Sequence, residues 1–268
     1  MSATSYICLS KQTKTYMNEI LKQFAPITLE EMSSVKLMNR TDTKFVTTMP
    51  MLLRLLEMAA PQYFAQEVAG KRVASYNTTY FDTTEFDMYY THQAGHANRQ
   101  KIRFRTYVDS DLQFMEVKTK NNHKRTKKKR MEVADMDLSD KEKLEFLQKY
   151  LRYDAGTLIP AIQNSFDRIT LVNRGKTERL TIDMNLQFHN LVTGTEKQMT
   201  DLVIVELKRD GLCYSPVLAM LNELRIHPHG FSKYCMGSAL TNHHLKVNRF
   251  KVKLLEVGKI LRGKASMP

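Results

Sequence analysis

The 268-residue sequence contains no tryptophan and only three cysteines, at positions 8, 213 and 235. No CxxC pair occurs, which argues against a zinc ribbon or a disulfide framework and favours reduced thiols. The sequence also lacks an apolar run of about 18 residues, so no transmembrane helix is expected. Its first residues lack the apolar core and cleavage site of a signal peptide. Together these absences predict a cytoplasmic protein.

Acidic residues are also scarce, and the formal net charge is +13. The segment Lys118–Arg130 holds eight lysines and arginines and no acid, and seven more from Lys246 onward face only Glu256. Such an excess predicts an anionic partner: nucleic acid, a phosphorylated metabolite, polyphosphate or anionic lipid.

The chain is expected to form an N-terminal helical arm (residues 1–28), one domain (29–245) and a basic C-terminal tail (246–268). Helices are predicted over Pro50–Ala60, Ser139–Tyr150 with Ser139 as cap, Ser215–Arg225, and from Ser232 onward. Alternating hydrophobicity predicts eight strands. Many strands with few helices, in no strict β-α-β order, predict an α+β fold with a large antiparallel sheet. The strands are Asn39–Val46, Ala74–Phe81, Lys101–Val108, Phe114–Lys120, Lys127–Val133, Ser165–Val172, Arg179–Met184 and Leu202–Lys208.

Five of these strands each place basic residues on one face and apolar residues on the other, because side chains alternate across a strand. A solvated polar face is the simpler explanation for any single strand. Like charges repel on a sheet, so their recurrence favours a bound polyanion, and a sheet closed into a tunnel would focus the positive field. The residues on these faces include Lys101, Arg103, Arg105, Glu116, Lys118, Lys120, Lys128, Arg130, Arg179, Glu206 and Lys208.

Two carboxylates stand on these charged faces, and each precedes a lysine by two residues. Glu116 and Glu206 have two alternative roles: ion pairs that hold Lys118 and Lys208, or ligands of Mg²⁺ or Mn²⁺, which are often bound by one or two carboxylates and substrate phosphates. Glu206 is our preferred metal ligand, and Glu116 is either structural or a second ligand.

Eight short motifs occur in a fixed order between about residues 30 and 242. They are Arg40-Thr-Asp-Thr-Lys44, Tyr80-Phe-Asp-Thr83, Lys101-Ile-Arg-Phe-Arg105, Glu116-Val-Lys118, Phe166-Asp-Arg168, Arg179-Leu-Thr-Ile-Asp183, Glu206-Leu-Lys208 and Phe231-Ser-Lys233. In this order they resemble the VTC domain, the polyphosphate polymerase domain of the vacuolar transporter chaperone complex. That family belongs to the triphosphate tunnel metalloenzymes, a CYTH-like group.

The resemblance implies a closed antiparallel β-tunnel flanked by helices, a divalent metal (Mn²⁺ or Mg²⁺), and ATP and inorganic polyphosphate as substrates. The implied activity is transfer of the γ-phosphate of ATP to a growing polyphosphate chain. A hydrolase of triphosphate or polyphosphate, or a non-catalytic sensor, would use the same tunnel. The implied phosphate contacts are Lys44, Arg103, Arg105, Lys118, Arg168, Ser232 and Lys233, with Glu206 on the metal. Further expected substrate-binding residues are Arg40, Lys101, Lys120, Arg130, Arg179 and Lys208.

The sequence departs from the family in two respects. Phe166 replaces the family's tyrosine, which removes a hydroxyl. The membrane helices and phosphate-sensing domain of the fungal complex are missing, which predicts a free-standing domain of the bacterial type. The tail is either a packed helix or a basic amphipathic helix that docks on a membrane or membrane protein. The run His123–Arg130 is either a solvated loop or a site that recruits polyphosphate; it lacks the interleaved aromatics expected for nucleic acid.

Overall fold

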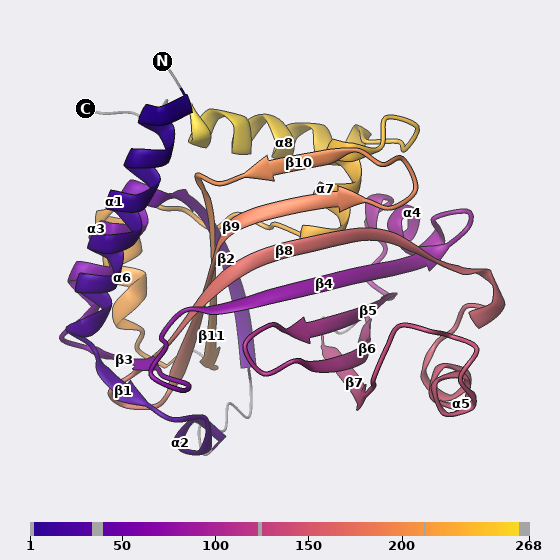
Figure 1. Ribbon diagram of the computed structural model, residues 1–268, viewed down its shortest axis with the longest axis horizontal. Helices are drawn as coiled ribbons and strands as arrows, with labels where there is room; N and C mark the ends of the chain where they lie inside the picture. Colours follow the sequence, from indigo (N-terminus) through magenta and orange to yellow (C-terminus); the bar gives the residue numbers. More distant parts are fainter. Residues whose placement is uncertain (1–2, 34–39, 123–124, 212, 263–268) are drawn as a thin grey trace. The chain divides into compact units, whose positions relative to one another are not determined.

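The computed structural model describes residues 3–33, 40–122, 125–211 and 213–262. The chain forms two compact units and passes between them several times. Two long strands, β8 (Leu158–Asn173) and β9 (Glu178–Asn190), have residues in both units (Figure 1). Unit 1 comprises Met1–Val73, Arg168–Met184 and Asp201–Phe231. Unit 2 comprises Ala74–Asp167, Asn185–Thr200 and Ser232–Pro268.

Unit 1 is a sheet with helices on its apolar face. Strand β11 (Leu202–Asp210) pairs antiparallel with β2 (Arg40–Thr48) on one side and with β9 on the other, while the short strands β1 (Ala25–Ile27) and β3 (Tyr63–Gln66) pair parallel. Val203, Val205 and Leu207 of β11 belong to a core that also includes residues of α1 (Ala3–Lys22), α3 (Met49–Ala59) and α6 (Pro216–Glu223). A further short helix, α2, covers Leu29–Ser33. The polar residues of β11 therefore lie on the opposite face.

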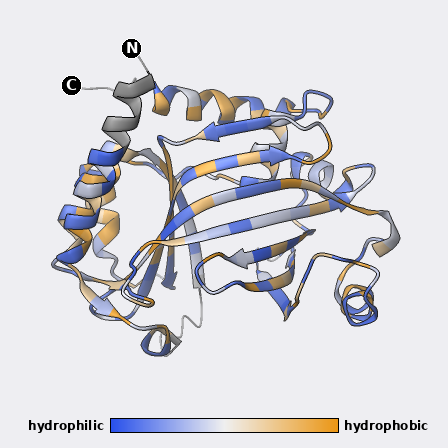
Figure 2. Cartoon of the chain, viewed as in Figure 1, coloured by the Kyte–Doolittle hydropathy of each residue, from blue (hydrophilic) through white to orange (hydrophobic). Residues whose placement is uncertain are grey.

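Unit 2 contains β4 (Ala74–Thr83), β5 (Arg99–Tyr107), β6 (Leu112–Lys120) and β7 (Thr126–Glu132), paired antiparallel in that order. Ile102, Phe104, Met115 and Val117 are buried with Leu147 of α5 (Lys141–Tyr150), which leaves the basic residues of these strands on the other face. Figure 2 shows the alternation of hydrophilic and hydrophobic residues along the strands. The unit is completed by α4 (Asp87–Gln93), the 3₁₀ turn Ala155–Thr157, β10 (Glu196–Met199), α7 (Lys233–Thr241) and α8 (Asn248–Leu261).

The predicted α+β class, with a mainly antiparallel sheet and flanking helices, is confirmed. The main path of the sheet runs β2-β11-β9-β8-β4-β5-β6-β7, and these strands are the eight expected from the sequence. Among the described residues, β2 and β7 end this path and are not hydrogen-bonded to each other, so backbone hydrogen bonds do not close the sheet. The predicted boundaries at residues 28/29 and 245/246 stay predictions.

Three details of the helices differ from expectation. Helix α5 begins one residue later than predicted, because the carboxylate of Asp140, rather than Ser139, accepts the capping hydrogen bond from the Lys143 amide. Ser215 stands at the N-cap position of α6 but makes no side-chain cap bond. Helices α2 and α4 and strands β1, β3 and β10 were not predicted. None of the helices in the described part of the chain combines the length and apolar character needed to span a membrane.

Candidate functional site

The polar face of unit 2 carries three lysines in direct register across three strands. Lys101 of β5 lies opposite Lys118 of β6, and Lys118 lies opposite Lys128 of β7; these three residues are called the cation ladder below. Side chains directly opposite on neighbouring antiparallel strands have Cβ atoms about 4.5–5.5 Å apart. The three lysines add positive charge to this face, which attracts anions.

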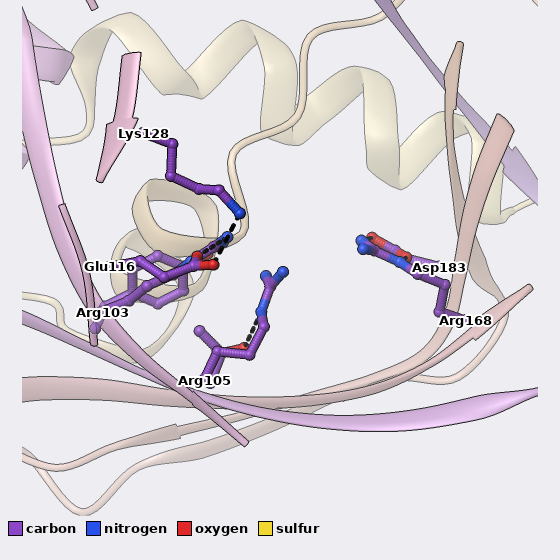
Figure 3. A network of polar contacts seen from close by, with 8 residues as sticks. Arg103, Arg105, Glu116, Lys128, Arg168 and Asp183 are labelled. Carbon is purple, nitrogen blue, oxygen red and sulfur yellow. Dashed lines mark hydrogen bonds and ion pairs between the residues drawn. The ribbon is translucent and has the colours of Figure 1, made fainter. Parts of the chain in front are cut away.

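Glu116 lies in the next register row and is the buried acidic centre of this face. Its side chain is 1% exposed. Two guanidinium nitrogens of Arg103 donate to its Oε2 at 2.7 and 2.5 Å, and Lys128 donates to Oε1 at 3.0 Å (Figure 3). Burial alone would raise the Glu116 pKa, but Arg103, Arg105 and Lys128 outweigh burial and lower the pKa to about 2. Both carboxylate oxygens are thus engaged by cations, which favours the structural role for Glu116 over metal ligation.

Tyr80 is a member of this face that sequence reasoning missed, although it opens the Tyr80-Phe-Asp-Thr83 motif. Arg103 donates to its hydroxyl oxygen at 3.3 Å. Burial raises the Tyr80 pKa, but the positive charges of Arg103, Arg105 and Lys101 exceed this effect, and the net pKa is lowered. The lowered pKa of Tyr80 is thus a consequence of the positive potential of this face.

Asp82 of the same motif joins two helices. Its carboxylate accepts hydrogen bonds from the amides of Thr83, Met88 and Tyr89, and so caps the start of α4. It also accepts a hydrogen bond from the Tyr234 hydroxyl of α7. Burial, the largest effect, raises the Asp82 pKa. This carboxylate fixes the N-terminal turn of α7 beside the basic face.

Arg105 and Lys233 each lie over an aromatic ring of unit 2. The Arg105 guanidinium donates to the Thr78 hydroxyl at 3.4 Å and lies 5.5 Å from the Tyr76 ring centre. Tyr76 stacks on Phe166 at 5.3 Å with an interplanar angle of 4°, and the Lys233 ammonium lies 3.8 Å from the Phe166 ring centre. Phe166 therefore acts as a cation platform, for which the missing hydroxyl is not needed.

The N-terminus of α7 meets the cation ladder at Ser232. The Ser232 hydroxyl caps the helix by accepting from the Cys235 amide at 3.2 Å, and Lys101 donates to the same oxygen at 2.7 Å. Lys101 also lies 3.8 Å from the Cys235 sulfur, which is 2.9 Å from His92 Nδ1. Burial, then the charges of Lys101 and other cations, lowers the His92 pKa far below its usual range, so His92 is neutral.

Unit 1 carries a second charged group on the polar face of β11. Glu206 accepts from Lys208 at 3.0 Å and lies in register between Lys44 of β2 and Thr181 of β9. Lys208 also donates to the Thr181 hydroxyl at 3.3 Å. Burial lowers the Lys208 pKa more than the Glu206 charge raises it. The Glu206–Lys208 ion pair considered from the sequence is thus present.

Four further predicted residues belong to unit 1. Arg168 grips Asp183 with two hydrogen bonds, Nε to Oδ1 at 2.6 Å and an Nη to Oδ2 at 2.8 Å, and Figure 3 shows this paired geometry. The Lys44 ammonium donates to the Phe231 carbonyl at 3.2 Å. Arg179 lies opposite Lys208 in register. Arg40 begins β2, and its side chain lies outside the description.

In unit 1, Glu206 is the carboxylate that we expect to hold a divalent metal. Within the described ranges, no three His, Cys, Asp or Glu side chains converge as a metal-binding group. A single carboxylate fits Mg²⁺ or Mn²⁺, which take many of their ligands from phosphates and water, and does not fit zinc, which needs three or four protein ligands.

The predicted site residues thus fall into one set in each unit. Sequence reasoning assigned no role to the carboxylate of Asp183, the Thr181 hydroxyl or the Tyr80 phenol, although all three lie inside quoted motifs. Unit 2 holds Lys101, Arg103, Arg105, Glu116, Lys118, Lys120, Arg130, Ser232 and Lys233, and unit 1 holds Arg40, Lys44, Arg168, Arg179, Glu206 and Lys208.

These features define an α+β protein whose antiparallel strands expose clustered arginines and lysines with few carboxylates. The model of the VTC domain family matches residues 39–242. The chain therefore belongs to the VTC domain family, which confirms the resemblance drawn from its motifs.

No protein of curated function matches the sequence significantly. Among solved structures, a proposed adenylate cyclase from Bacillus halodurans is similar at 14% identity and a TM-score of 0.49, covering 80% of this chain and 99% of that one. HpAC1 from Hippeastrum, described as having a dominant triphosphatase activity, is similar at 13% identity and a TM-score of 0.45, covering 76% and 98%. These likenesses are too distant to assign a function.

Proposed function

We propose that this protein is a metal-dependent polyphosphate polymerase that transfers the γ-phosphate of ATP to the end of a polyphosphate chain. Membership of the VTC domain family makes this the first function to consider. The observation that carries it is the basic face of unit 2, where the cation ladder lies beside Arg103, Arg105 and the capped start of α7. Such a face suits a substrate made of successive phosphates.

The reaction needs positioning and charge neutralisation rather than a general base. A terminal phosphate oxygen, already ionised near neutral pH, forms a bond to the γ-phosphorus while the bond from that phosphorus to the bridging oxygen breaks and ADP leaves. Each arginine would donate two parallel hydrogen bonds to phosphate oxygens, and the lysines would act as point charges. Ser232 would add the amides at the start of α7.

Glu206 is the residue that would hold the divalent ion. When bound, Mg²⁺ or Mn²⁺ would neutralise negative charge on the phosphates. Replacing Glu206 by Gln should abolish metal-dependent turnover and leave metal-free tripolyphosphate binding intact or tighter, because an anion is lost beside Lys208. Binding is measured by calorimetry in chelator, so it gives a readout independent of activity. Unchanged turnover in this variant would show that Glu206 is not the metal ligand and that another carboxylate holds the ion.

The decisive assay incubates the purified protein with ATP and Mn²⁺, then stains gels for long polyphosphate and measures free phosphate. Long chains support the polymerase. Free phosphate without chains would identify a hydrolase, and tight binding with neither product would identify a sensor.

The substrate contacts are best tested at Arg105. Replacing Arg103 would leave the buried Glu116 with one cation fewer, whereas Arg105→Ala removes a cation hydrogen-bonded to a neutral hydroxyl. Loss of its phosphate contacts should cost about 1.5–3 kcal/mol of tripolyphosphate binding. If Arg105→Ala binds tripolyphosphate with the affinity of the parent, Arg105 does not contact the phosphates.

A further inference from the structure

The sequence allows two interpretations of the basic run on β7, and the structure describes this run from Arg125 onward. His123 and Lys124 lie outside the described residues. Lys127, Lys128, Lys129 and Arg130 are all exposed. They alternate, so that Lys128 and Arg130 lie on the polar face with Glu116, and Lys127 and Lys129 lie on the opposite face. One strand therefore presents cations on both sides of the sheet.

The opposite face gathers further positive charge at the end of α5. The ammonium groups of Lys129 and Lys149 lie 5.5 and 5.6 Å from the centre of the same ring, that of Tyr150. Lys127 stands two residues before Lys129 on the same face. Lys127, Lys129 and Lys149 are called the outer cluster below. The C-terminal dipole of α5 attracts cations and accounts for Lys149, but it does not explain the four successive cations on β7.

Strand β7 is also an edge. In the described part of the chain it pairs only with β6, so its outward backbone groups are open to a ligand. The cation ladder crosses the polar face from Lys101 to Lys128 and ends at this same edge. An extended polyanion can therefore follow cations from Ser232 across the face, over the edge and onto the outer cluster.

We infer that the β7 edge and the outer cluster form a docking surface for a long inorganic polyphosphate chain, beyond the groups that hold a triphosphate. This inference rests on the proposed function, because it assumes that the polar face of unit 2 binds phosphates. Among the described residues, two aromatic rings contact the cations of this surface, Phe114 beneath Arg130 and Tyr150 beneath Lys129 and Lys149, so basic side chains already cover both rings. That composition fits a polyanion without bases, since single-stranded nucleic acids need rings on which bases stack.

The test compares long-chain polyphosphate with tripolyphosphate over a series of salt concentrations. The variant is Lys127→Gln/Lys129→Gln, and the matched control is Lys11→Gln/Lys14→Gln, which removes two exposed lysines from α1. The logarithm of the binding constant falls linearly with the logarithm of the salt concentration, and each phosphate contact adds about 0.7 to the magnitude of that slope. For the long chain, the slope of the variant should therefore be smaller in magnitude than the parent's by about 1.4. Its tripolyphosphate affinity and melting temperature should equal the parent's.

An unchanged long-chain salt dependence, or an equal change in the control, would overturn the inference. Tighter binding of single-stranded RNA than of polyphosphate at equal charge would overturn the choice of partner. If the parent binds no tripolyphosphate, the proposed function itself fails. Tripolyphosphate binding with an unchanged long-chain response refutes only the outer surface.

Discussion

Glu116 shows at the scale of one residue how a buried charge organises the basic face. Its carboxylate holds Arg103 and Lys128, which come from two other strands. Removing one partner of a buried ion pair is expensive because the remaining charge stays desolvated. The carboxylate thus stabilises the apo protein by dividing a group of cations that would otherwise repel one another.

Glu116→Gln should remove part of the acid dependence of stability. Because folding lowers the pKa of Glu116 from 4.5 to about 2, its contribution is complete above pH 4.5 and is lost as the pH falls through about 2. We expect the variant to be about 2–4 kcal/mol less stable at pH 7, and the difference from the parent to shrink below pH 4.5. Urea unfolding at several pH values measures this.

The control for this prediction is Glu145→Gln, since Glu145 is an exposed glutamate of α5 that lies 3.9 Å from Lys141. Exposed pairs of this kind contribute roughly 0–1 kcal/mol. A constant difference between the Glu116 variant and the parent from pH 7 to pH 2 would contradict the assignment.

Single residues also mark the limit of what the sequence could predict. Alternation placed Arg103 and Glu116 on charged faces correctly, because the period of a strand is a local property. It could not pair them, because their contact depends on the register between β5 and β6. Lys128 lies diagonally from Glu116 rather than opposite it. To predict its hydrogen bond to Glu116, the conformation of the Lys128 side chain must be known as well as the register.

At the scale of elements, α4 is the clearest omission from the sequence prediction. It is only seven residues long, and its start is capped from Asp82, which lies at the end of the preceding strand. Phe86 stands at the N-cap position with a φ of 58°, which is uncommon for a residue other than glycine. The sequence signal for α4 was the pair Asp82 and Thr83, which directly follows a predicted strand and whose side chains can cap a helix.

Helix α7 depends on a glycine at its contact with the sheet. A Cβ added at Gly237 would lie 2.5 Å from the Phe188 ring and 2.9 Å from Ile162. Gly237→Ala should therefore destabilise the protein by about 1–3 kcal/mol through overpacking, although alanine itself favours a helix. Thermal unfolding measures the loss, and tripolyphosphate affinity shows whether α7 has shifted.

Gly258→Ala in α8 is the matched control, because its nearest contacts are guanidinium atoms of Arg262 at 3.5 Å or more. There the gain in helix propensity should appear alone, as up to about 1 kcal/mol of added stability. Equal effects of the two substitutions would refute the packing explanation.

The tail contains a helix with a buried side. In α8, Phe250 contacts the Tyr89 ring edge-on at 5.8 Å, and Val257 is also buried. Truncation after His244 should therefore destabilise unit 2 by several kcal/mol, in the range of large-to-small core substitutions of about 3–5 kcal/mol. A truncated protein with the parent's melting temperature would show that this packing contributes little.

Lipid docking of α8 needs a test that keeps the helix. Val252 and Leu255 are exposed between exposed lysines, a pattern compatible with an anionic membrane surface. Lys251→Gln/Lys259→Gln should weaken binding to anionic vesicles at low salt by about 2 kcal/mol, since each basic residue contributes about 1 kcal/mol. Failure of the parent to bind such vesicles at low salt would exclude lipid docking.

For the whole molecule, the net charge of +13 makes stability dependent on anions. A ligand that binds only the folded state stabilises it by about 2.7 kcal/mol at 100 times its Kd. Tripolyphosphate should therefore raise the melting temperature in low salt, and by less in high salt as screening grows. Orthophosphate at equal ionic strength is the control, and an equal rise with both anions would argue against a site for successive phosphates.

The fold class could be predicted at this scale because the pattern of eight strands and few helices is strong. Closure of the sheet could not be predicted, because it depends on pairing between strands that are distant in sequence. The described backbone hydrogen bonds do not supply it. The family match confirms what the motifs indicated, because short motifs in a fixed order over 200 residues carry more information than any one of them.

The edge strand β7 has one more consequence, for self-association. Open strand edges pair with one another and lead to aggregation, and lysines on an edge prevent this by repulsion. We therefore expect the four successive cations on β7 to keep two copies of the protein apart. A long phosphate chain lying on β7 would cancel that repulsion and offer each copy the same counter-charge. The number of copies held together would then grow with chain length, and we expect light scattering to rise with it.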